Sequence, residues 1–567
     1  MLDFKLIKNT NGEYIETSIA GKLLLNTAAL NKETAFSEAE RSEFNLLGKL
    51  PAQVETLAEQ VKRAYWQFQS YATMLQKNIY LNNLHDKNQV LFYKLVSEHL
   101  VEILPCIYTP IVGTAVKEYS REFRQARGLY IAYPYRDKIA EILDNRSHPE
   151  IDLIVVTDGE GVLGIGDQGI GGMDIPIAKL MVYTLCAGIN PLRTLPILLD
   201  VGTDNQELLA DPLYLGLRHP RIRGAEYDAF IEQFVTAVQS KFPNVFLHWE
   251  DFGRSTARHI LDQYKDKLCT FNDDIQGTGA VTLAAILAAA KATGSSIEKQ
   301  RVVLFGAGTA GTGIADQICA AMMRAGLTEA EARQRFWLVD RPGLLLSNMP
   351  DLTSGQMPYA HKPEEVANWQ VSSPVGISLY DTITHAQPTI LIGCSTQGGA
   401  FKQEIIRELT RYNKHPIIFP LSNPTEHAEA TPADILQWTN GQAIVATGSP
   451  FEDVNFNGQI IKIGQCNNAL VFPGIGLGLL AIQAKQLTDD MLWAATQALV
   501  ENAPVLKDMH APVLPLMQDA RVVARKIALA VAQQAQRDGL AQLEIADLER
   551  RIDELMWQPH YVPLRRT

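Results

Sequence analysis

Two pairs of adjacent acids are the residues in this sequence whose types and spacing most clearly indicate chemistry. Glu250 and Asp251 stand in FLHWEDF at the end of a predicted strand, and Asp273 and Asp274 stand in CTFNDDIQGTG just before a predicted helix. Converging carboxylate oxygens suit Mg²⁺ or Mn²⁺, whereas Zn²⁺ prefers His or Cys. Adjacent acids are also common as solvated groups, and NDDIQG is also typical of a helix N-cap. The residues alone leave both interpretations open.

Lys179 and Tyr108 are candidates for proton transfer. Lys179 lies among apolar neighbours in IPIAKLMVY, and a partly buried lysine can have its pKa lowered enough to act as a base. Tyr108 lies beside a proline in the apolar stretch CIYTPIVG. It is therefore either a core tyrosine or a proton donor.

Two glycine loops fit the dinucleotide pattern G-x-G-x-x-G, GIGDQG at 164–169 and GAGTAG at 306–311. GAGTAG follows the apolar run RVVLF and leads into a helical pattern, the setting in which a pyrophosphate approaches a helix N-terminus. GIGDQG is followed by GIGGMDIP, whose Pro176 argues against a helix start and predicts a tight loop or turn. The predicted NAD loop therefore comprises Gly306, Gly308, Thr309, Ala310 and Gly311.

Asp340 ends the next predicted strand, FWLVD, and is placed to accept hydrogen bonds from an adenosine ribose. Its separation from Gly311 exceeds the ~20 residues usually expected, and the insert LTEAEARQR accounts for the difference. Asp340 suits a free 2′-hydroxyl and would repel a 2′-phosphate, which favours NAD over NADP. Arg341, just beyond it, weakens that preference.

The elements that must position these residues fall into three zones. The first third is predicted to be helical, because PAQVETLAEQVKRAYWQFQSYATMLQKNIYLNNL and DKNQVLFYKLVSEHLVEILP place apolar residues three and four apart. From about residue 150 we expect the strands IDLIVVTD, VLGIGD, TLPILLDVGT and VFLHWEDF. From about residue 300, five apolar runs alternate with helical segments, which indicates a doubly wound parallel sheet. These runs are RVVLFGAG, FWLVD, TILIGCS, PIIFPLSN and AIVATGSP, and helices follow to near residue 540.

Composition sets the broad class. A chain of 567 residues that is 46% hydrophobic and 20% charged is typical of a globular protein of about two to four domains. The net charge of -12 argues against nucleic acid as a partner, since phosphate binding needs a basic face. Six scattered cysteines without a CxxC pair indicate reduced thiols. The N-terminal segment lacks the features of a secretory signal, and the apolar run AVTLAAILAAA at 280–290 is too short to span a bilayer. We therefore expect a cytoplasmic protein without membrane partners.

Eight ordered blocks resemble the malic enzymes. They extend from about residue 80 to 530 and cover most of the chain. The blocks are IYTPIVG, VVTDGEGVLGIGDQGIGGMDIPIAKL, WEDF, CTFNDDIQGTGAV, LFGAGTAGTGIA, PLSNPT, ATGSPF and QCNNALVFPGIGLG. The resemblance implies oxidative decarboxylation of L-malate to pyruvate and CO₂, with NAD and Mn²⁺ or Mg²⁺, in a homodimer or homotetramer.

The resemblance also implies roles for individual residues. Tyr108 is similar to the general acid of the family, Lys179 to its general base, and Asp273 to the carboxylate beside the catalytic lysine. GIGDQG is implied to be part of the malate site. The implied metal ligands are Glu250, Asp251 and Asp274. The residues implied to contact substrate or nicotinamide are Asn423 and Asn467, and those implied to lie on the cofactor side are Asp274 and Asn423.

Three departures from the family pattern resemble the malolactic enzymes, which convert malate to lactate and CO₂ with bound NAD. Gly161 stands where the family usually has an arginine that pairs with the substrate carboxylate. Asp174 stands where a glycine is common, and GRSTARHIL follows WEDF. Our hypothesis is that Arg124, Arg127 or Arg254 replaces this missing positive charge.

The sequence therefore predicts an α/β protein with a helical N-terminal region, an α/β malate-binding domain, a Rossmann-type doubly wound NAD domain and C-terminal helices. The predicted boundaries are 1–275 for the N-terminal region with the malate and metal site, 276–535 for the NAD domain and 536–567 for a tail. An NAD-dependent malic enzyme is the leading interpretation, and a malolactic enzyme is the alternative. A third interpretation is a non-catalytic sensor of NAD or a dicarboxylate, which would not need the complete set of acids with Lys179 and Tyr108.

Overall fold

The computed structural model describes residues 4–9, 12–162, 164–372 and 375–567. The chain forms two compact units. The first comprises Met1–Gly159, Gln168–Val245 and Glu554–Thr567, and the second comprises Glu160–Asp167 and Phe246–Asp553. The domain boundaries expected at residues 275 and 535 stay a prediction.

Helices dominate the early part of the first unit, as the apolar spacing predicts. They are α3 (Leu57–Ser70), α4 (Met74–Lys87), α5 (Gln89–Glu98) and α7 (Ile111–Glu122). Thr56 and Thr73 begin α3 and α4 with capping boxes that satisfy N-terminal backbone donors. The short turn between α6 (Leu100–Ile103) and α7 carries Tyr108.

The first unit also contains three parallel strands, in the order β3 (Leu129–Ala132), β5 (Thr194–Asp200) and β4 (Leu153–Thr157). Helix α9 (Asp174–Ala187) packs against β4 and β5 and carries Lys179. The prediction that GIGGMDIP does not begin a helix is wrong. A 3₁₀ turn at Gly169–Met173 leads directly into α9, and Pro176 lies in the first helical turn, where no intrahelical N–H is needed.

A small sheet joins segments from the two ends of the chain. Strands β1 (Phe4–Asn9) and β2 (Gly12–Thr17) form an antiparallel hairpin, and β17 (Leu564–Arg566) pairs in parallel with β2. Leu564 is buried in a cluster that includes Leu24, Phe36 and Phe44. The sequence patterns did not predict this sheet, because they describe short stretches and cannot show a pairing across the whole chain.

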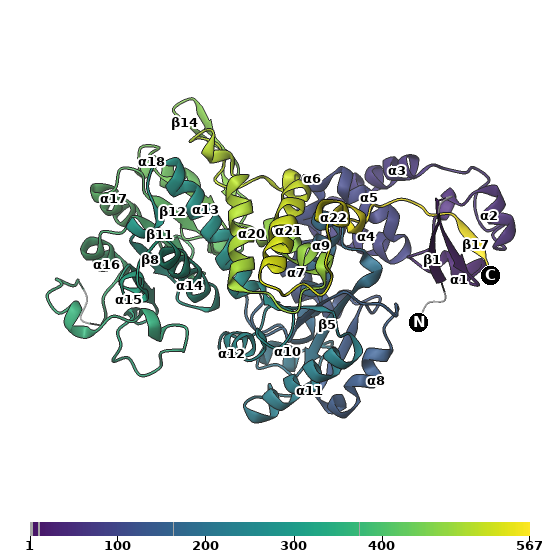
Figure 1. The fold of residues 1–567 in the computed structure, drawn as a ribbon, viewed down its shortest axis with the longest axis horizontal. Coiled ribbons are helices and arrows are strands. Elements are labelled where there is room, and N and C mark those ends of the chain that lie inside the picture. Colours follow the sequence, from purple (N-terminus) through teal and green to yellow (C-terminus); the bar gives the residue numbers. More distant parts are fainter. Residues whose placement is uncertain (1–3, 10–11, 163, 373–374) are drawn as a thin grey trace. The chain divides into compact units, whose positions relative to one another are not determined.

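The second unit contains a seven-stranded sheet in the order β10-β9-β8-β11-β12-β13-β16, and its edge strands are β10 (Gly343–Leu344) and β16 (Gly464–Gln465). Every neighbouring pair is parallel except β10 with β9. Helices around this sheet include α14 (Thr309–Arg324), α16 (Leu379–Ala386), α17 (Gln403–Tyr412) and α18 (Pro432–Trp438) (Figure 1). The five predicted strands are confirmed as β8 (Val302–Phe305), β9 (Phe336–Asp340), β11 (Ile390–Gly393), β12 (Ile417–Pro420) and β13 (Ile444–Thr447). The strand order reverses direction between β8 and β11, and nucleotides bind at such switch points.

Two further strands of the second unit lead directly into the paired acids. They are β6 (Phe246–Trp249) and β7 (Thr270–Asn272), which pair in parallel. By contrast, VLGIGD is not the short strand that we expected. Its described residues form a turn closed by one bridge between Val162 and Gly166, and residue 163 lies outside the described segments.

Apolar helices pack within the second unit. They are α13 (Thr278–Ala292), α19 (Phe472–Ile482), α20 (Asp489–Glu501) and α21 (Ala520–Arg537). By length and composition, the helical stretches Gly169–Ala187 and Asp273–Ala292 could each cross a membrane. The second stretch contains the run at 280–290, so the expectation that this region is too short to span a bilayer fails for the whole helical stretch. However, 94% of the apolar window in Gly169–Ala187 and 78% of that in Asp273–Ala292 is buried inside the structure. Core packing therefore accounts for their apolar character.

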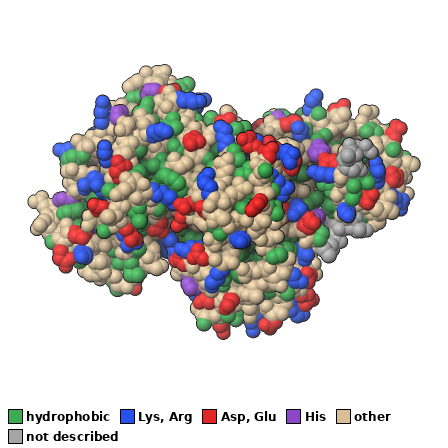
Figure 2. Space-filling view, viewed as in Figure 1, with side chains coloured by type: hydrophobic (Ala, Val, Ile, Leu, Met, Phe, Trp, Pro, Cys, Tyr) green, Lys and Arg blue, Asp and Glu red, His purple; other side chains and the backbone are tan. Residues whose placement is uncertain are grey.

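On the face shown in Figure 2, acidic and basic side chains are interspersed.

Candidate active site

Asp251 occupies a strained turn directly after β6. Its φ of +55° lies in the left-handed region that non-glycine residues seldom adopt. Its carbonyl accepts a hydrogen bond from Gly161 N at 2.8 Å, which helps to hold the turn. Such outliers persist where the surrounding structure over-determines them and are concentrated at functional sites.

The two pairs of acids lie close together, as the sequence predicts. Candidate ligand oxygens of Glu250, Asp251 and Asp274 lie within 4.8 Å of one another. Asp274 is half-buried, whereas Glu250 and Asp251 are each only 2% exposed. Several buried carboxylates cannot all ionise cheaply without a compensating positive charge. The donor set therefore fits a hard divalent cation bound by oxygen ligands.

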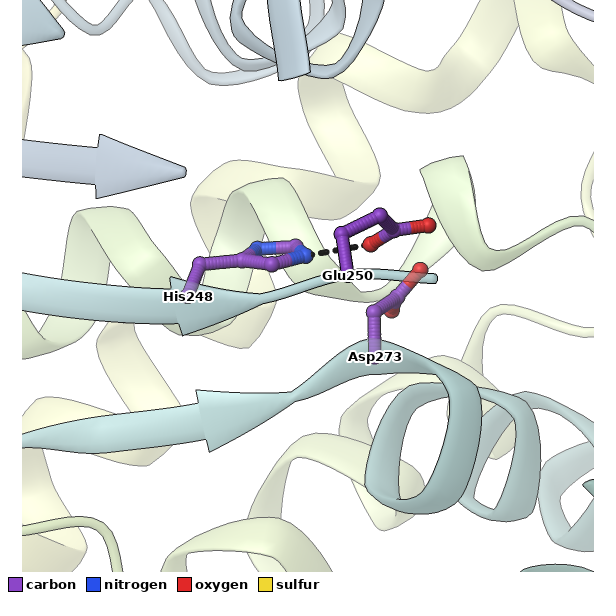
Figure 3. Close-up of side chains that lie close together, drawn as sticks. All are labelled: His248, Glu250 and Asp273. Atoms are coloured by element: carbon purple, nitrogen blue, oxygen red, sulfur yellow. Dashed lines mark hydrogen bonds and ion pairs between the residues drawn. The ribbon is translucent and has the colours of Figure 1, made fainter. Parts of the chain in front are cut away.

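Hydrogen-bond donors orient three of the four acids, Glu250, Asp273 and Asp274. His248 Nε2 lies 2.6 Å from Glu250 Oε2 (Figure 3). Asn468 Nδ2 donates to Asp273 Oδ2 at 2.9 Å, and the backbone N–H of Asp251 donates to Asp274 Oδ2 at 2.8 Å. Sequence reasoning missed His248 and Asn468. A histidine within an apolar strand carries no signal beyond its position two residues before Glu250.

A π-helical turn at Asp273–Gly277 presents the second pair of acids before α13 begins. The Asn272 side chain caps this turn by accepting from Ile275 N at 2.9 Å. NDDIQG thus does contain an N-cap, but the capping residue is Asn272 rather than either acid. The acids remain available for another role, and π-helical turns are frequent at functional sites.

Lys179 and Tyr108 lie next to each other in the first unit. The Lys179 Nζ is 5.6 Å from the centroid of the Tyr108 ring, and the two residues are 3% and 6% exposed. Asp174, at the start of the helix that carries Lys179, is half-buried. Burial raises the pKa of Asp174 to about 6, and Arg127 opposes this shift.

The predicted NAD loop requires glycine at two positions and is open at a third. A Cβ at Gly306 would lie 2.4 Å from the backbone of Cys394, and one at Gly311 would lie 2.1 Å from the Gly306 carbonyl. No atom lies within 4 Å of a Cβ built at Gly308, so the loop is open there. Thr309 and Ala310 begin α14 (Thr309–Arg324), where unpaired backbone N–H groups bind phosphate.

Asp340 ends β9, as predicted, and is held by three donors. Its Oδ2 accepts from Arg254 Nη2 and from Gln356 Nε2, both at 3.1 Å, and its Oδ1 accepts from Arg341 N at 2.9 Å. Arg254 also donates to the Ala307 carbonyl at 2.6 Å. A cavity of about 180 Å³ lies beside this contact, lined in part by Arg254, Gly308 and Thr309.

Three arginines were considered as replacements for the arginine that the family usually has at position 161. The hydrogen bonds described for them go to other partners than the carboxylate cluster. Arg124 pairs with Glu122 at 2.8 Å, and Arg127 binds Asp86 at 2.7 Å. Arg254 binds the nucleotide loop and Asp340. At position 161 itself, a Cβ would lie 2.6 Å from the Phe252 carbonyl. The turn after β6 therefore requires glycine at position 161 and excludes an arginine in this backbone conformation.

GIGDQG lies against loops of the nucleotide-binding sheet. A Cβ at Gly164 would be 2.9 Å from Thr396 Cγ2 and 3.5 Å from the Asn423 carbonyl. The loops after β11 and β12, which contain Thr396 and Asn423, are joined by the fully buried Glu429. Its Oε1 accepts from Ser395 N at 2.8 Å, Ser395 Oγ at 2.7 Å and Ser422 Oγ at 2.6 Å.

The two predicted amide residues lie in different loops of the second unit. The Asn423 Oδ1 accepts from Ser449 Oγ at 2.5 Å. The Asn467 side chain caps a short 3₁₀ turn by accepting from Ala469 N at 2.9 Å. The next residue, Asn468, reaches Asp273. The structure thus gives Asn467 a structural contact and places its neighbour at the carboxylate cluster.

A parallel sheet with a glycine loop, an acid at the end of the second strand and a buried carboxylate cluster together define a Rossmann-type nucleotide-dependent α/β protein. Residues 85–265 match the family described as "Malic enzyme, N-terminal domain", and residues 275–536 match "Malic enzyme, NAD binding domain". The chain belongs to the malic enzyme family, and it contains an NAD-binding domain.

Related sequences extend over nearly the full chain. An NAD-dependent malic enzyme of Vibrio parahaemolyticus is 50% identical over 550 residues, which covers 97% of this chain and 98% of the relative. One of Edwardsiella ictaluri is 51% identical over 549 residues, covering 97% of each chain. The malic enzyme structure of Pyrococcus horikoshii is similar in fold, with a TM-score of 0.55 and 24% identity, covering 80% of this chain and 89% of that one.

Proposed function

We propose that this chain catalyses the oxidative decarboxylation of L-malate to pyruvate and CO₂, with NAD as the hydride acceptor and Mn²⁺ or Mg²⁺ as the metal. The observation that carries this proposal is the buried cluster of Glu250, Asp251 and Asp274 within the unit that holds the NAD loop. The names of the relatives that are about 50% identical support the same reaction.

Glu250, Asp251 and Asp274 would hold the metal, and residues 306–311 with Asp340 would hold NAD. When bound, the ion would supply Lewis-acid polarisation of the substrate and NAD would supply a hydride acceptor. The hard oxygen donor set suits Mn²⁺ and Mg²⁺ alike. Asn423 and Asn467 lie in loops that we assign to the substrate and nicotinamide.

Lys179 and Tyr108 would transfer the protons. Neutral Lys179 takes the proton of the C2 hydroxyl as the hydride leaves C2. The C3–C4 bond then breaks, CO₂ departs, and the bonding electrons remain in the enolate of pyruvate. Tyr108 returns a proton to C3, which completes the balance. Asp273 would stabilise the protonated lysine.

The test is an assay of the purified protein with L-malate, NAD and Mn²⁺, in which NADH, pyruvate and lactate are all quantified. Equal amounts of NADH and pyruvate support the proposal. Lactate without released NADH would instead establish the malolactic reaction, and no turnover with intact NADH binding would favour a sensor. Lys179→Ala and Tyr108→Phe should each lower kcat about 10²–10⁴-fold, the usual contribution of a proton-transfer group.

We further propose that the protein is a cytoplasmic homodimer or homotetramer that needs neither nucleic acid nor a membrane. The family resemblance and the six scattered cysteines without a CxxC pair support this assignment. Light scattering coupled to size-exclusion chromatography would measure the oligomeric state, and cell fractionation would measure the location.

A further inference from the structure

His248 contacts Glu250, one of the proposed metal ligands, and is completely buried. The centroid of its ring lies 5.3 Å from that of Phe271 and 5.8 Å from that of Phe472, and the imidazole is nearly perpendicular to both phenyl rings. Phe271 comes from β7 and Phe472 from α19. Two elements besides its own strand therefore fix the orientation of the imidazole.

The strand itself aims the imidazole at Glu250. Side chains two residues apart on a strand share a face, so β6 and the residue after it bring His248 and Glu250 together. The two side chains point toward each other in Figure 3. A Glu250 carboxylate that binds a cation is ionised and only accepts hydrogen bonds, so in that state His248 Nε2–H is the donor to Oε2 in the 2.6 Å contact.

Glu250 is the shared member of two groups of close ligand atoms. One comprises Glu250, Asp251 and Asp274, and the other comprises His248, Glu250 and Asp273. An imidazole could itself bind a metal, but the His248 ring packs against two phenyl rings and its Nε2 is directed at Glu250. This geometry favours a role exerted through Glu250.

We propose that His248 is a positioning residue that holds the Glu250 carboxylate in the orientation needed to bind the divalent ion. Residues that orient a metal ligand typically contribute 10–100-fold to metal affinity. The inference rests on the proposed metal site and adds a residue that does not itself bind the ion.

Two substitutions separate hydrogen bonding from packing. His248→Gln places an amide N–H at a reach similar to that of Nε2, whereas His248→Met fills a similar volume without a donor. Mn²⁺ affinity would be measured on the full-length protein by electron paramagnetic resonance of the free ion. The NADH affinity, from fluorescence, reports whether the second unit remains folded. We expect His248→Met to weaken Mn²⁺ binding 10–100-fold with unchanged NADH affinity, and His248→Gln to stay within about threefold of wild type.

Three outcomes would contradict the inference in distinguishable ways. Wild-type protein that binds NADH but not Mn²⁺ would overturn both the metal site and the role of His248. Wild-type binding that His248→Met leaves unchanged would overturn the role of His248 alone. Equal losses in the Gln and Met variants would show that ring packing, rather than the hydrogen bond, governs the site. His248→Asn, whose amide is one methylene too short, repeats the comparison if the Met variant does not fold.

Discussion

Arg254 links the nucleotide loop to Asp340 and therefore belongs to the cofactor side of the site. Replacing it with alanine removes a charge-assisted bond to the Ala307 carbonyl and one of the donors on Asp340. The guanidinium is 45% exposed, so water compensates for part of the loss. We expect Arg254→Ala to weaken NAD binding about 2–10-fold, equivalent to about 0.4–1.4 kcal/mol, and to leave the KM for malate unchanged.

Steady-state kinetics with each substrate varied would measure this difference. Lys265→Ala, directly after helix α12 (Arg254–Tyr264), removes an exposed charge that pairs with Asp262 and serves as the control. A raised malate KM with unchanged NAD binding would return Arg254 to the role of the missing substrate-binding charge.

Asp174 should make stability depend on pH. Its carboxyl group is protonated in both the folded and unfolded states below its ordinary pKa of 3.8, and its folded pKa is about 6. Between these values only the unfolded state is ionised, so the free energy of unfolding falls as pH rises through this window and the penalty is complete above about pH 6. The upper limit is about 3 kcal/mol, at ~1.36 kcal/mol per pKa unit.

Asp174→Asn removes this ionisation. The difference in the free energy of unfolding between variant and wild type should therefore be more favourable to the variant at pH 8 than at pH 4. Chemical denaturation at the two pH values would measure the difference. A gain or loss of the same size at both values would mean that Asp174 ionises as readily in the folded protein as in the unfolded chain.

The sequence predicts the grouping of the acids but not what holds them. Carboxylates after β6 and before α13 meet because β6 and β7 are parallel neighbours, and parallel strands end at the same edge of a sheet. The supporting donors His248 and Asn468 have no such pattern, because their roles depend on side-chain directions. Likewise, the sequence shows Gly161 as a missing arginine, whereas the structure gives a steric reason for the glycine.

At the scale of elements, Glu429 fixes the loops after β11 and β12 relative to each other. Glu429→Ala removes the acceptor of donors on half-buried Ser395 and buried Ser422, and a buried donor left unsatisfied costs about 1–3 kcal/mol. We expect a lower melting temperature and at least tenfold weaker NADH binding, because the Asn423 loop loses its support. Thermal unfolding and NADH fluorescence would measure both effects.

Glu429→Gln keeps the Oε1 acceptor and should recover much of the loss. Glu426→Ala removes an exposed acid three residues earlier and should change neither property. If Glu429→Ala bound NADH like wild type, the buried carboxylate would have no part in shaping the cofactor site.

The long periodic elements follow from the sequence, and the short irregular ones do not. Five apolar runs correctly predict β8, β9, β11, β12 and β13 because the strands of a covered parallel sheet are buried on both faces. The strand predicted at VLGIGD is wrong, because its alternation of glycine with apolar residues belongs to a turn. Gly164 and Gly166 both have positive φ there, which breaks a strand. The start of α9 was missed because Pro176 argues against a helix anywhere beyond its first turn.

At the scale of the whole molecule, Leu564 attaches the final strand to the N-terminal sheet. It is 4% exposed in a cluster formed otherwise by residues from the N-terminal segment. Leu564→Ala should cost about 2–5 kcal/mol locally. Hydrogen exchange should then accelerate at Ile15–Thr17, the residues that pair with β17, and stay unchanged in β8. Thr567→Ala, which keeps the backbone bond to Thr17, is the control, and uniform acceleration throughout the chain would refute a local effect.

The pairing of β17 with β2 also determines an order of events during synthesis. His560 and Glu13, which hydrogen-bond beside this sheet, are 547 positions apart. At about 5–20 residues per second, the ribosome needs about 30–110 s to make the intervening chain. Throughout that interval the hairpin is a marginally stable two-stranded sheet with an open edge. On a crowded polysome, the nascent chain is therefore exposed for about a minute to pairing with its neighbours, and a chaperone bound to the first 17 residues would prevent it.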